Sequence, residues 1–213
     1  SEPIVLESYH CTFFGGLSHV DTSSVRINWK ASLKQDFETL RSFHGDLNKA
    51  LFWALNCHHF SLFSSIVKTS FSQAPHLLEK TKEPSTMENI LQSSITRGAW
   101  DEFLLLLDAG VNAEVFNSTG RNALHTCAFW GRTHFMEELV IHRGFNVTSL
   151  EKTYGQSCMH IASSRGHVEM MELLYHIAPQ LVLQPDKDRW IPLSVASSKS
   201  QTVCYSLSFF FFF

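Results

Sequence analysis

The sequence predicts an all-α solenoid built from about four to five stacked helix-turn-helix units, some of them degenerate. Two observations support this prediction. Short segments recur with a period of about 34 residues, and each clear copy carries a glycine where the two helices of a unit would meet. The composition suits such a fold, because 44% of the 213 residues are hydrophobic and can form a core.

Two central copies align without gaps over their first half. Residues 120–125 read Gly-Arg-Asn-Ala-Leu-His, and residues 155–160 read Gly-Gln-Ser-Cys-Met-His. A second glycine follows each histidine by six residues, at Gly131 and Gly166. The same frame extends to both sides, with apolar anchors at intervals of 33, 35 and 34 residues: Leu91, Leu124, Met159 and Leu193. This regularity predicts a repeat stack over residues 87–208.

The glycines and the apolar residues both suit paired helices. Gly98, Gly131 and Gly166 are predicted to lie between antiparallel helices, where a left-handed backbone is cheap only for glycine. After Gly166, apolar residues at positions 170, 171, 173, 174 and 177 form one stripe at helical spacing. A single pair of helices cannot bury its own apolar face, so neighbouring units must stack and shield each other.

This pattern resembles the ankyrin repeat, a unit of about 33 residues in which a Thr-Pro-Leu-His segment opens the first helix and a glycine separates the two helices. The opening segment is matched by Ala123-Leu124-His125, Cys158-Met159-His160 and Pro192-Leu193-Ser194. The end of the unit is matched by residues 108–113, which read Asp-Ala-Gly-Val-Asn-Ala. The resemblance covers about residues 86 to 208 and implies an ankyrin-repeat solenoid.

Two departures from the family pattern predict local differences. Gln92 stands in the histidine position of the first clear unit. One residue more separates Gly131 from Gly144 than separates Gly98 from Gly110. The second helix of that unit is therefore predicted to be bulged or longer than its counterparts.

No enzyme is predicted. The sequence has no glycine-rich nucleotide loop and no Gly-x-Ser-x-Gly segment, so no catalytic residue is assigned. His125 and His160 lie at predicted helix starts, and we interpret each as bonding to the backbone of a neighbouring unit rather than acting in catalysis.

The rest of the chain divides by composition. Residues 45–70 fit the same frame as a degenerate ankyrin-like repeat, with His58-His59 in the positions of the turn glycine and the residue after it. Residues 71–86 contain two prolines and a charged run, and are predicted to be a loop insertion. Residues 1–44 have no assigned fold, apart from an amphipathic helix predicted near 31–44.

Both ends of the chain are unusual. Ser1 stands where a complete protein would carry Met, which indicates a fragment or an incomplete gene model. Residues 209–213 are five phenylalanines, whereas the end of a solenoid normally presents a polar face. This Phe run is therefore interpreted as a truncation or a gene-model artefact.

Charge and cysteine spacing argue against several classes of function. The formal net charge of -3 argues against a nucleic-acid partner, which normally requires a basic face. No apolar run is long enough for a membrane span within this chain, and no secretory signal opens it. Five widely spaced cysteines without a Cys-x-x-Cys pair favour an intracellular location, cytoplasmic or nuclear, and offer no zinc-site spacing. No metal and no cofactor are predicted.

The resemblance implies partner binding through the tips of the hairpin loops and the exposed face of the first helices. The positions that it implies are Arg97, Arg121, Phe129, Trp130, Thr153, Tyr154, Gln156, Arg165, Lys187 and Trp190. Trp130 and Tyr154 would form an aromatic and arginine patch if exposed, and such residues dominate interface hot spots. The alternative for Phe129 is packing between units. Arginine side chains indicate a partner segment with carboxylate or phosphate groups.

The function predicted from these residues is a non-catalytic protein–protein interaction module whose partner the sequence does not identify. The alternative is that the chain is the cytosolic repeat segment of a larger protein, such as a membrane channel or a ubiquitin-ligase adaptor. In that case the repeats would serve as an internal scaffold.

Overall fold

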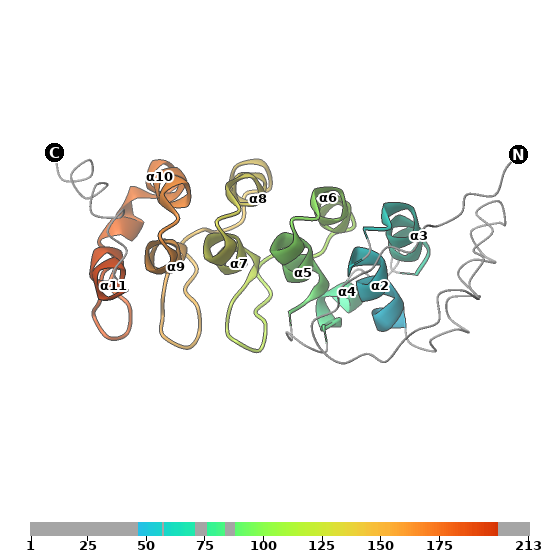
Figure 1. Ribbon diagram of the computed structural model, residues 1–213, viewed down its shortest axis with the longest axis horizontal. Helices are drawn as coiled ribbons and strands as arrows, with labels where there is room; N and C mark the ends of the chain where they lie inside the picture. Colours follow the sequence, from blue (N-terminus) through green and yellow to red (C-terminus); the bar gives the residue numbers. More distant parts are fainter. Residues whose placement is uncertain (1–46, 57, 71–75, 84–87, 200–213) are drawn as a thin grey trace, which may run out of the picture.

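The part of the chain that the structure describes is built mainly from helices arranged in pairs, with loops between them (Figure 1). The structure, a computed structural model, describes residues 47–56, 58–70, 76–83 and 88–199. The helix predicted near 31–44 and the Phe run at 209–213 lie outside these described residues.

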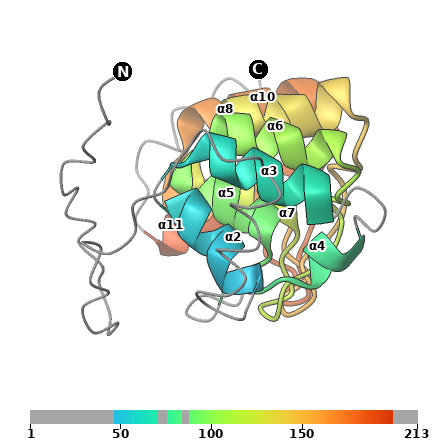
Figure 2. The same ribbon diagram turned by 90° about the vertical axis from the view of Figure 1, so that its right-hand side faces the viewer.

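The helices fall into two layers. The inner layer contains the first helix of each pair, and the outer layer the second helix (Figures 1 and 2). The inner helices are α2 (Leu47–Asn56), α5 (Ile90–Arg97), α7 (Ala123–Trp130), α9 (Cys158–Arg165) and α11 (Pro192–Ser198). The outer helices are α3 (Phe60–Ser70), α6 (Trp100–Asp108), α8 (Thr133–Glu137) with the π-helix η2 (Glu138–His142), and α10 (Val168–Ile177) with the 3-10 helix η3 (Pro179–Val182). Among the described residues the only β-type pairing is one isolated bridge, so the predicted all-α solenoid is confirmed.

The predicted anchors mark successive layers of the stack. Each of the four is the second residue of its inner helix, from Leu91 in α5 through Leu124 and Met159 to Leu193 in α11. Leu91, Leu124 and Met159 are buried, whereas Leu193 is half-buried in the last helix described. Helices α5, α7, α9 and α11 pack against one another in that order. Each unit therefore covers the apolar side of the next, as the period predicted.

Three inner helices begin with the same reciprocal cap. Asn89, Asn122 and Ser157 each accept a hydrogen bond from the backbone amide three residues later through their side chains. The residue at that third position is Gln92, His125 or His160. Its side chain in turn accepts a hydrogen bond from the backbone amide of the capping residue. This capping box satisfies two amides that a helix start leaves unpaired.

The turn between paired helices is repeated down to its backbone angles. Gly131 has a φ of 66°, and a Cβ atom added there would lie 2.9 Å from Nδ1 of His167. In the first helix pair the corresponding residue is His58, which adopts the same left-handed conformation with a φ of 54°. The amide of His59 then donates to the carbonyl of Ala54 at 3.0 Å, the bond that Arg132 makes to Cys127 at 2.9 Å. This geometry supports the proposal that residues 45–70 form a degenerate repeat.

The extra residue after Gly131 is accommodated by a change of helix type. Helix α8 gives way to η2, a π-helix, in which the amide of Arg143 donates to the carbonyl of Glu138 at 3.0 Å. A π-helix takes up one inserted residue within a turn. The prediction of a bulged or longer second helix is confirmed.

The segment before α5 contains one short helix, α4 (His76–Lys80), within the range predicted as a loop insertion. Leu78 of α4 is fully buried. Lys82 and Asn89 form the isolated antiparallel bridge ahead of α5.

Candidate functional site

Hydrogen bonds between units fix the bases of the hairpin loops. Nε2 of His160 lies 2.9 Å from the carbonyl oxygen of Trp190, and the side chain of Gln92 donates to the carbonyl of Arg121 at 2.8 Å. Because a carbonyl only accepts, the proton of neutral His160 lies on Nε2 and its Nδ1 accepts from Ser157. The predicted bond from His160 to a neighbouring unit is confirmed.

His125 differs from His160. Its Nε2 is buried and makes no hydrogen bond of normal geometry with the described residues, although the backbone of Ser149 and of Gln156 lies close enough to act on it. Burial lowers the pKa of His125 to about 4, although the negative charge of Glu151 and, to a smaller extent, the backbone of Ser149 and of Gln156 act in the opposite direction. Burial likewise lowers the pKa of His160. Both imidazoles are therefore neutral structural groups at pH 7.

The hairpin tips share one internal bonding pattern. An acceptor side chain at the start of each tip, belonging to Asn117, Glu151 or Asp186, bonds backbone amides two to four residues later. Glu151 also accepts a hydrogen bond from the amide of Tyr154. These tips are thus pre-formed turns, which lowers the entropy lost when a partner binds.

Adjacent tips are joined to each other. The amide of Lys152 donates to the carbonyl of Gly120 at 3.0 Å, and the amide of Lys187 donates to that of Tyr154 at 3.1 Å. Nζ of Lys187 also donates to the carbonyls of Lys152 and Thr153. Figure 2 shows the tips gathered on one side of the stack. Lys187, a predicted binding residue, therefore uses its ammonium group within the protein.

Three exposed aromatic side chains lie at predicted binding positions. Tyr154 is 58% exposed, Trp130 46% and Trp190 45%. Tyr154 and Trp190 are in hairpin segments, and Trp130 ends α7. Thr153 is exposed and lies 3.4 Å from the carbonyl of Thr119 through its hydroxyl, in the adjacent tip.

Phe129 is the centre of a cluster with two arginines. The guanidinium carbon of Arg165 lies 3.6 Å from the centroid of the Phe129 ring, and that of Arg121 lies 4.7 Å from it. The ring of Trp130 meets Phe129 edge-on, with centroids 5.3 Å apart. Phe129 is half-buried, so it is neither a core residue nor a free surface residue. We name Arg121, Phe129, Trp130 and Arg165 the arginine–aromatic cluster.

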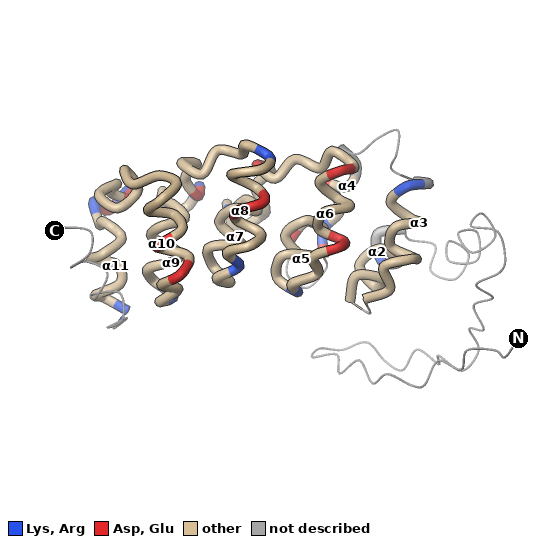
Figure 3. Tube along the Cα trace, turned by 90° about the horizontal axis from the view of Figure 1, so that it is seen from above, with Lys and Arg blue, Asp and Glu red and all other residues tan. Residues whose placement is uncertain are grey.

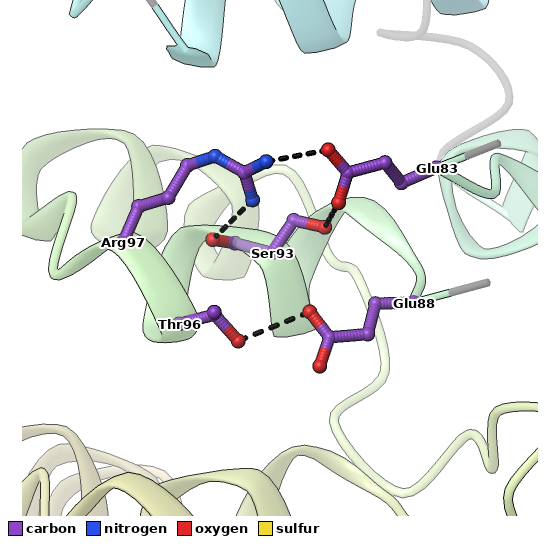
Figure 4. Close-up of polar contacts among 5 residues, drawn as sticks. All are labelled: Glu83, Glu88, Ser93, Thr96 and Arg97. Carbon is purple, nitrogen blue, oxygen red and sulfur yellow. Dashed lines mark hydrogen bonds and ion pairs between the residues drawn. The ribbon is translucent and has the colours of Figure 1, made fainter. Parts of the chain in front are cut away.

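Arg97 lies outside this cluster and forms an ion pair of its own. Figure 4 shows its guanidinium group bonded to Glu83, with Nη2 and Oε1 2.5 Å apart. The side chain of Glu83 is 7% exposed and that of Arg97 23%. Arg97 also donates to the carbonyl of Ser93 at 3.3 Å. Sequence reasoning missed Glu83 because it lies 14 residues away in a segment without the repeat period.

Glu88 lies beside this ion pair and accepts a hydrogen bond from Thr96 at 3.0 Å (Figure 4). Burial raises its pKa, with a smaller contribution from the charge of Glu83, while the positive charges of Arg97 and Arg121 lower it. Arg121 is thus within electrostatic range of an acidic group, but no hydrogen bond joins the two. Gln156, the remaining predicted binding residue, is half-buried between the second and third clear units.

Charged residues of both signs are distributed along the stack rather than collected in one stripe (Figure 3). In the described part of the chain, no three His, Cys, Asp or Glu side chains converge as metal ligands. Nor does any described helix have the length and apolar character to cross a membrane. Burial raises the pKa of Cys127 and raises that of Cys158 to about 12, so both thiols are poor nucleophiles.

Comparison with known proteins identifies the repeated unit. The family model for the ankyrin repeat matches residues 154–184, which contain α9 and α10. The chain is also similar to Ankyrin repeat protein nuc-2 of Neurospora crassa, with 27% identity over 114 residues. This match covers 53% of the chain and 10% of that protein, so the chain spans a small part of its relative's length. Together with the stacked helix pairs and their shared turns, these matches identify residues 154–184 as an ankyrin repeat and support the same type of unit in the neighbouring helix pairs.

Proposed function

We propose that this chain is a non-catalytic protein–protein interaction module that binds its partner through the hairpin tips and the face of the inner helices. Ankyrin repeats generally serve as protein-interaction modules, and the family is typically non-catalytic. The observation that carries the proposal for this chain is the exposure of Trp130 at the end of an inner helix and of Tyr154 and Trp190 in two successive hairpins.

Exposed aromatic side chains leave a large apolar area in contact with water unless a partner covers them. Burying one Trp or Tyr side chain removes a large apolar area from water, which is why these residues dominate the energy of interfaces. Here Tyr154 and Trp190 belong to hairpins that are already held by internal hydrogen bonds and by bonds to each other, and Trp130 belongs to helix α7. A partner would therefore meet a pre-organised surface and lose little affinity to the ordering of loops.

Site-specific cross-linking tests this proposal. Trp130 is replaced by the photoreactive p-benzoylphenylalanine in one variant, and Ile141 in another. Ile141 is 59% exposed in the outer π-helix and serves as the matched control. We expect Trp130-labelled protein to capture a defined partner from extracts of its source cells, and Ile141-labelled protein not to capture it. The same adducts from both variants would contradict the proposed face.

A second candidate function is an internal scaffold within a larger protein, such as a membrane channel or a ubiquitin-ligase adaptor. The length of the relative favours it, because the matched region is 10% of that protein. In either case we propose an intracellular location, cytoplasmic or nuclear, which the free buried thiols of Cys127 and Cys158 support. Sequencing of the full transcript distinguishes the two candidates, since an adjoining channel or adaptor domain would favour the scaffold.

A further inference from the structure

The two arginines of the arginine–aromatic cluster differ from two other cationic groups of the same face. Arg97 is paired with Glu83, and Lys187 is bonded to the carbonyls of the adjacent tip. The guanidinium groups of Arg121 and Arg165 make no hydrogen bond and no ion pair with any residue that the structure describes. In this they resemble Lys152, whose ammonium group lies over the Phe116 ring. The contacts of the two arginines are with the ring of Phe129.

Stacking on a ring leaves the donors of a guanidinium group available. The N–H groups lie in the plane of the guanidinium and point outward from its edge, so a contact through the flat face occupies none of them. The ring holds each group in place through cation–π attraction, which reduces the side-chain entropy lost on binding. Phe129 therefore holds two guanidinium groups whose donors are not used by the described residues, with Arg165 exposed and Arg121 partly exposed.

Two positive charges held beside one ring favour the binding of a negatively charged ligand at this place. Arg121 precedes α7 and Arg165 ends α9, so the two forks come from successive units and each keeps its own contact with Phe129. A carboxylate matches one fork in a bidentate geometry. A ligand with two carboxylates on separate residues can engage both arginines without breaking either ring contact.

We propose that the arginine–aromatic cluster binds an acidic peptide segment, in which two carboxylates engage Arg121 and Arg165 and an intervening apolar side chain packs on Trp130. This inference rests on the proposed protein-binding function and specifies the chemistry of the partner. Trp130 supplies the apolar part because its exposed ring borders Phe129 at 5.3 Å. The combination of separate forks and a bordering indole favours a carboxylate-rich peptide over a single phosphate group.

Peptide selection on the full chain tests the proposal. A phage library of random dodecapeptides is panned against the wild type, an Arg121→Gln/Arg165→Gln variant and a Trp130→Ala variant. Arg143→Gln is the control for losing an arginine outside the cluster, because Arg143 lies after η2 and pairs with Asp108 and Glu138 on the outer side. We expect wild-type and Arg143→Gln protein to select peptides with two or more acidic residues flanking an apolar one. The double arginine variant should not select them.

Selected peptides are then synthesised and measured by fluorescence anisotropy. We expect Asp/Glu→Asn/Gln versions, and the arginine variants, to lose affinity by roughly tenfold or more, and binding to weaken with added salt. Phosphoserine versions that bind while the carboxylate peptides do not would overturn the proposal, as would selected peptides without acidic residues. Non-acidic peptides that still require Trp130 would refute this inference and leave the proposed function standing. The absence of any peptide sensitive to Trp130 or to the arginines would count against both.

Discussion

The side chain of Gln92 donates a hydrogen bond to the backbone carbonyl of Arg121 at 2.8 Å, across the boundary between two units. In the third clear unit His160 makes the equivalent bond to Trp190. Gln92 also accepts a bond from the amide of Asn89 through its Oε1, as the imidazole nitrogen of His160 does from Ser157. An amide and an imidazole thus perform the same two functions, because each places an acceptor and a donor at opposite ends of a planar group.

This equivalence predicts how position 92 responds to substitution. Gln92→His keeps both bonds and should leave the free energy of unfolding nearly unchanged. Gln92→Leu has a similar volume but leaves the carbonyl of Arg121 and the amide of Asn89 unpaired, and should destabilise the protein by about 1–3 kcal/mol. Urea denaturation followed by circular dichroism measures both. Equal stability of the Leu and His variants would show that the inter-unit bond contributes nothing.

Replacing His58 by glycine should stabilise the first helix pair. His58 has a φ of 54°, a left-handed conformation that costs a residue with a Cβ atom about 1–2 kcal/mol. The greater freedom of glycine in the unfolded chain offsets part of the gain, so we expect His58→Gly to raise the free energy of unfolding by about 1 kcal/mol. Denaturation in urea provides the measurement.

The matched control for this change is Lys199→Gly. Lys199 also ends an inner helix and is exposed, but its φ is -97°, a conformation that any residue adopts. Glycine there relieves no backbone strain and should lower stability slightly. If the two glycine variants changed stability by the same amount, the left-handed conformation at His58 would not be the cause.

Acid should destabilise the protein through His125. Because burial lowers the pKa of His125 from 6.5 to about 4, the folded state keeps this imidazole neutral where the unfolded chain protonates it. The unfolded state therefore binds more protons between about pH 6.5 and pH 4. The free energy of unfolding should fall by about 3 kcal/mol as the pH decreases through that range, and level off below it. Urea denaturation at several pH values from 7 to 4 measures this slope.

His125→Gln isolates this effect from other titrating groups. Gln92 shows that glutamine fits the same capping position, so the variant should fold while losing the titration. Glu88 acts with the opposite sign, because its raised pKa makes the folded state take up a proton before the unfolded chain does. The difference between wild type and variant removes that contribution. An unchanged pH slope in His125→Gln would rule out His125 as the acid-sensitive group.

The fold was predictable from the regular spacing of the sequence, whereas contacts between side chains far apart in the sequence were not. The turn glycines and the anchors from Leu91 to Leu193 are required by the local geometry of each unit, and that geometry recurs from one repeat to the next. The π-helix was also predictable, since a single extra residue after Gly131 must be accommodated within a fixed unit. The pairing of Arg97 with Glu83 was not, because Glu83 belongs to a segment outside the period. Nor does spacing reveal that Arg121 and Arg165 converge on Phe129, which depends on the paths of two long side chains.

Arg97 and Arg165 should therefore respond differently to substitution. Arg97 neutralises a nearly buried carboxylate, so Arg97→Ala should leave Glu83 without its cation and destabilise the protein by about 1–3 kcal/mol. Arg165 is exposed and forms no ion pair with the described residues, so Arg165→Ala removes only its contact with the Phe129 ring and should cost less than about 1 kcal/mol. Adding Glu83→Gln to Arg97→Ala should recover part of the loss, because it removes the stranded charge. Thermal and urea denaturation of the three variants measure these effects. If Arg97→Ala and Arg165→Ala lowered the free energy of unfolding equally, Arg97 would not have a structural role that Arg165 lacks.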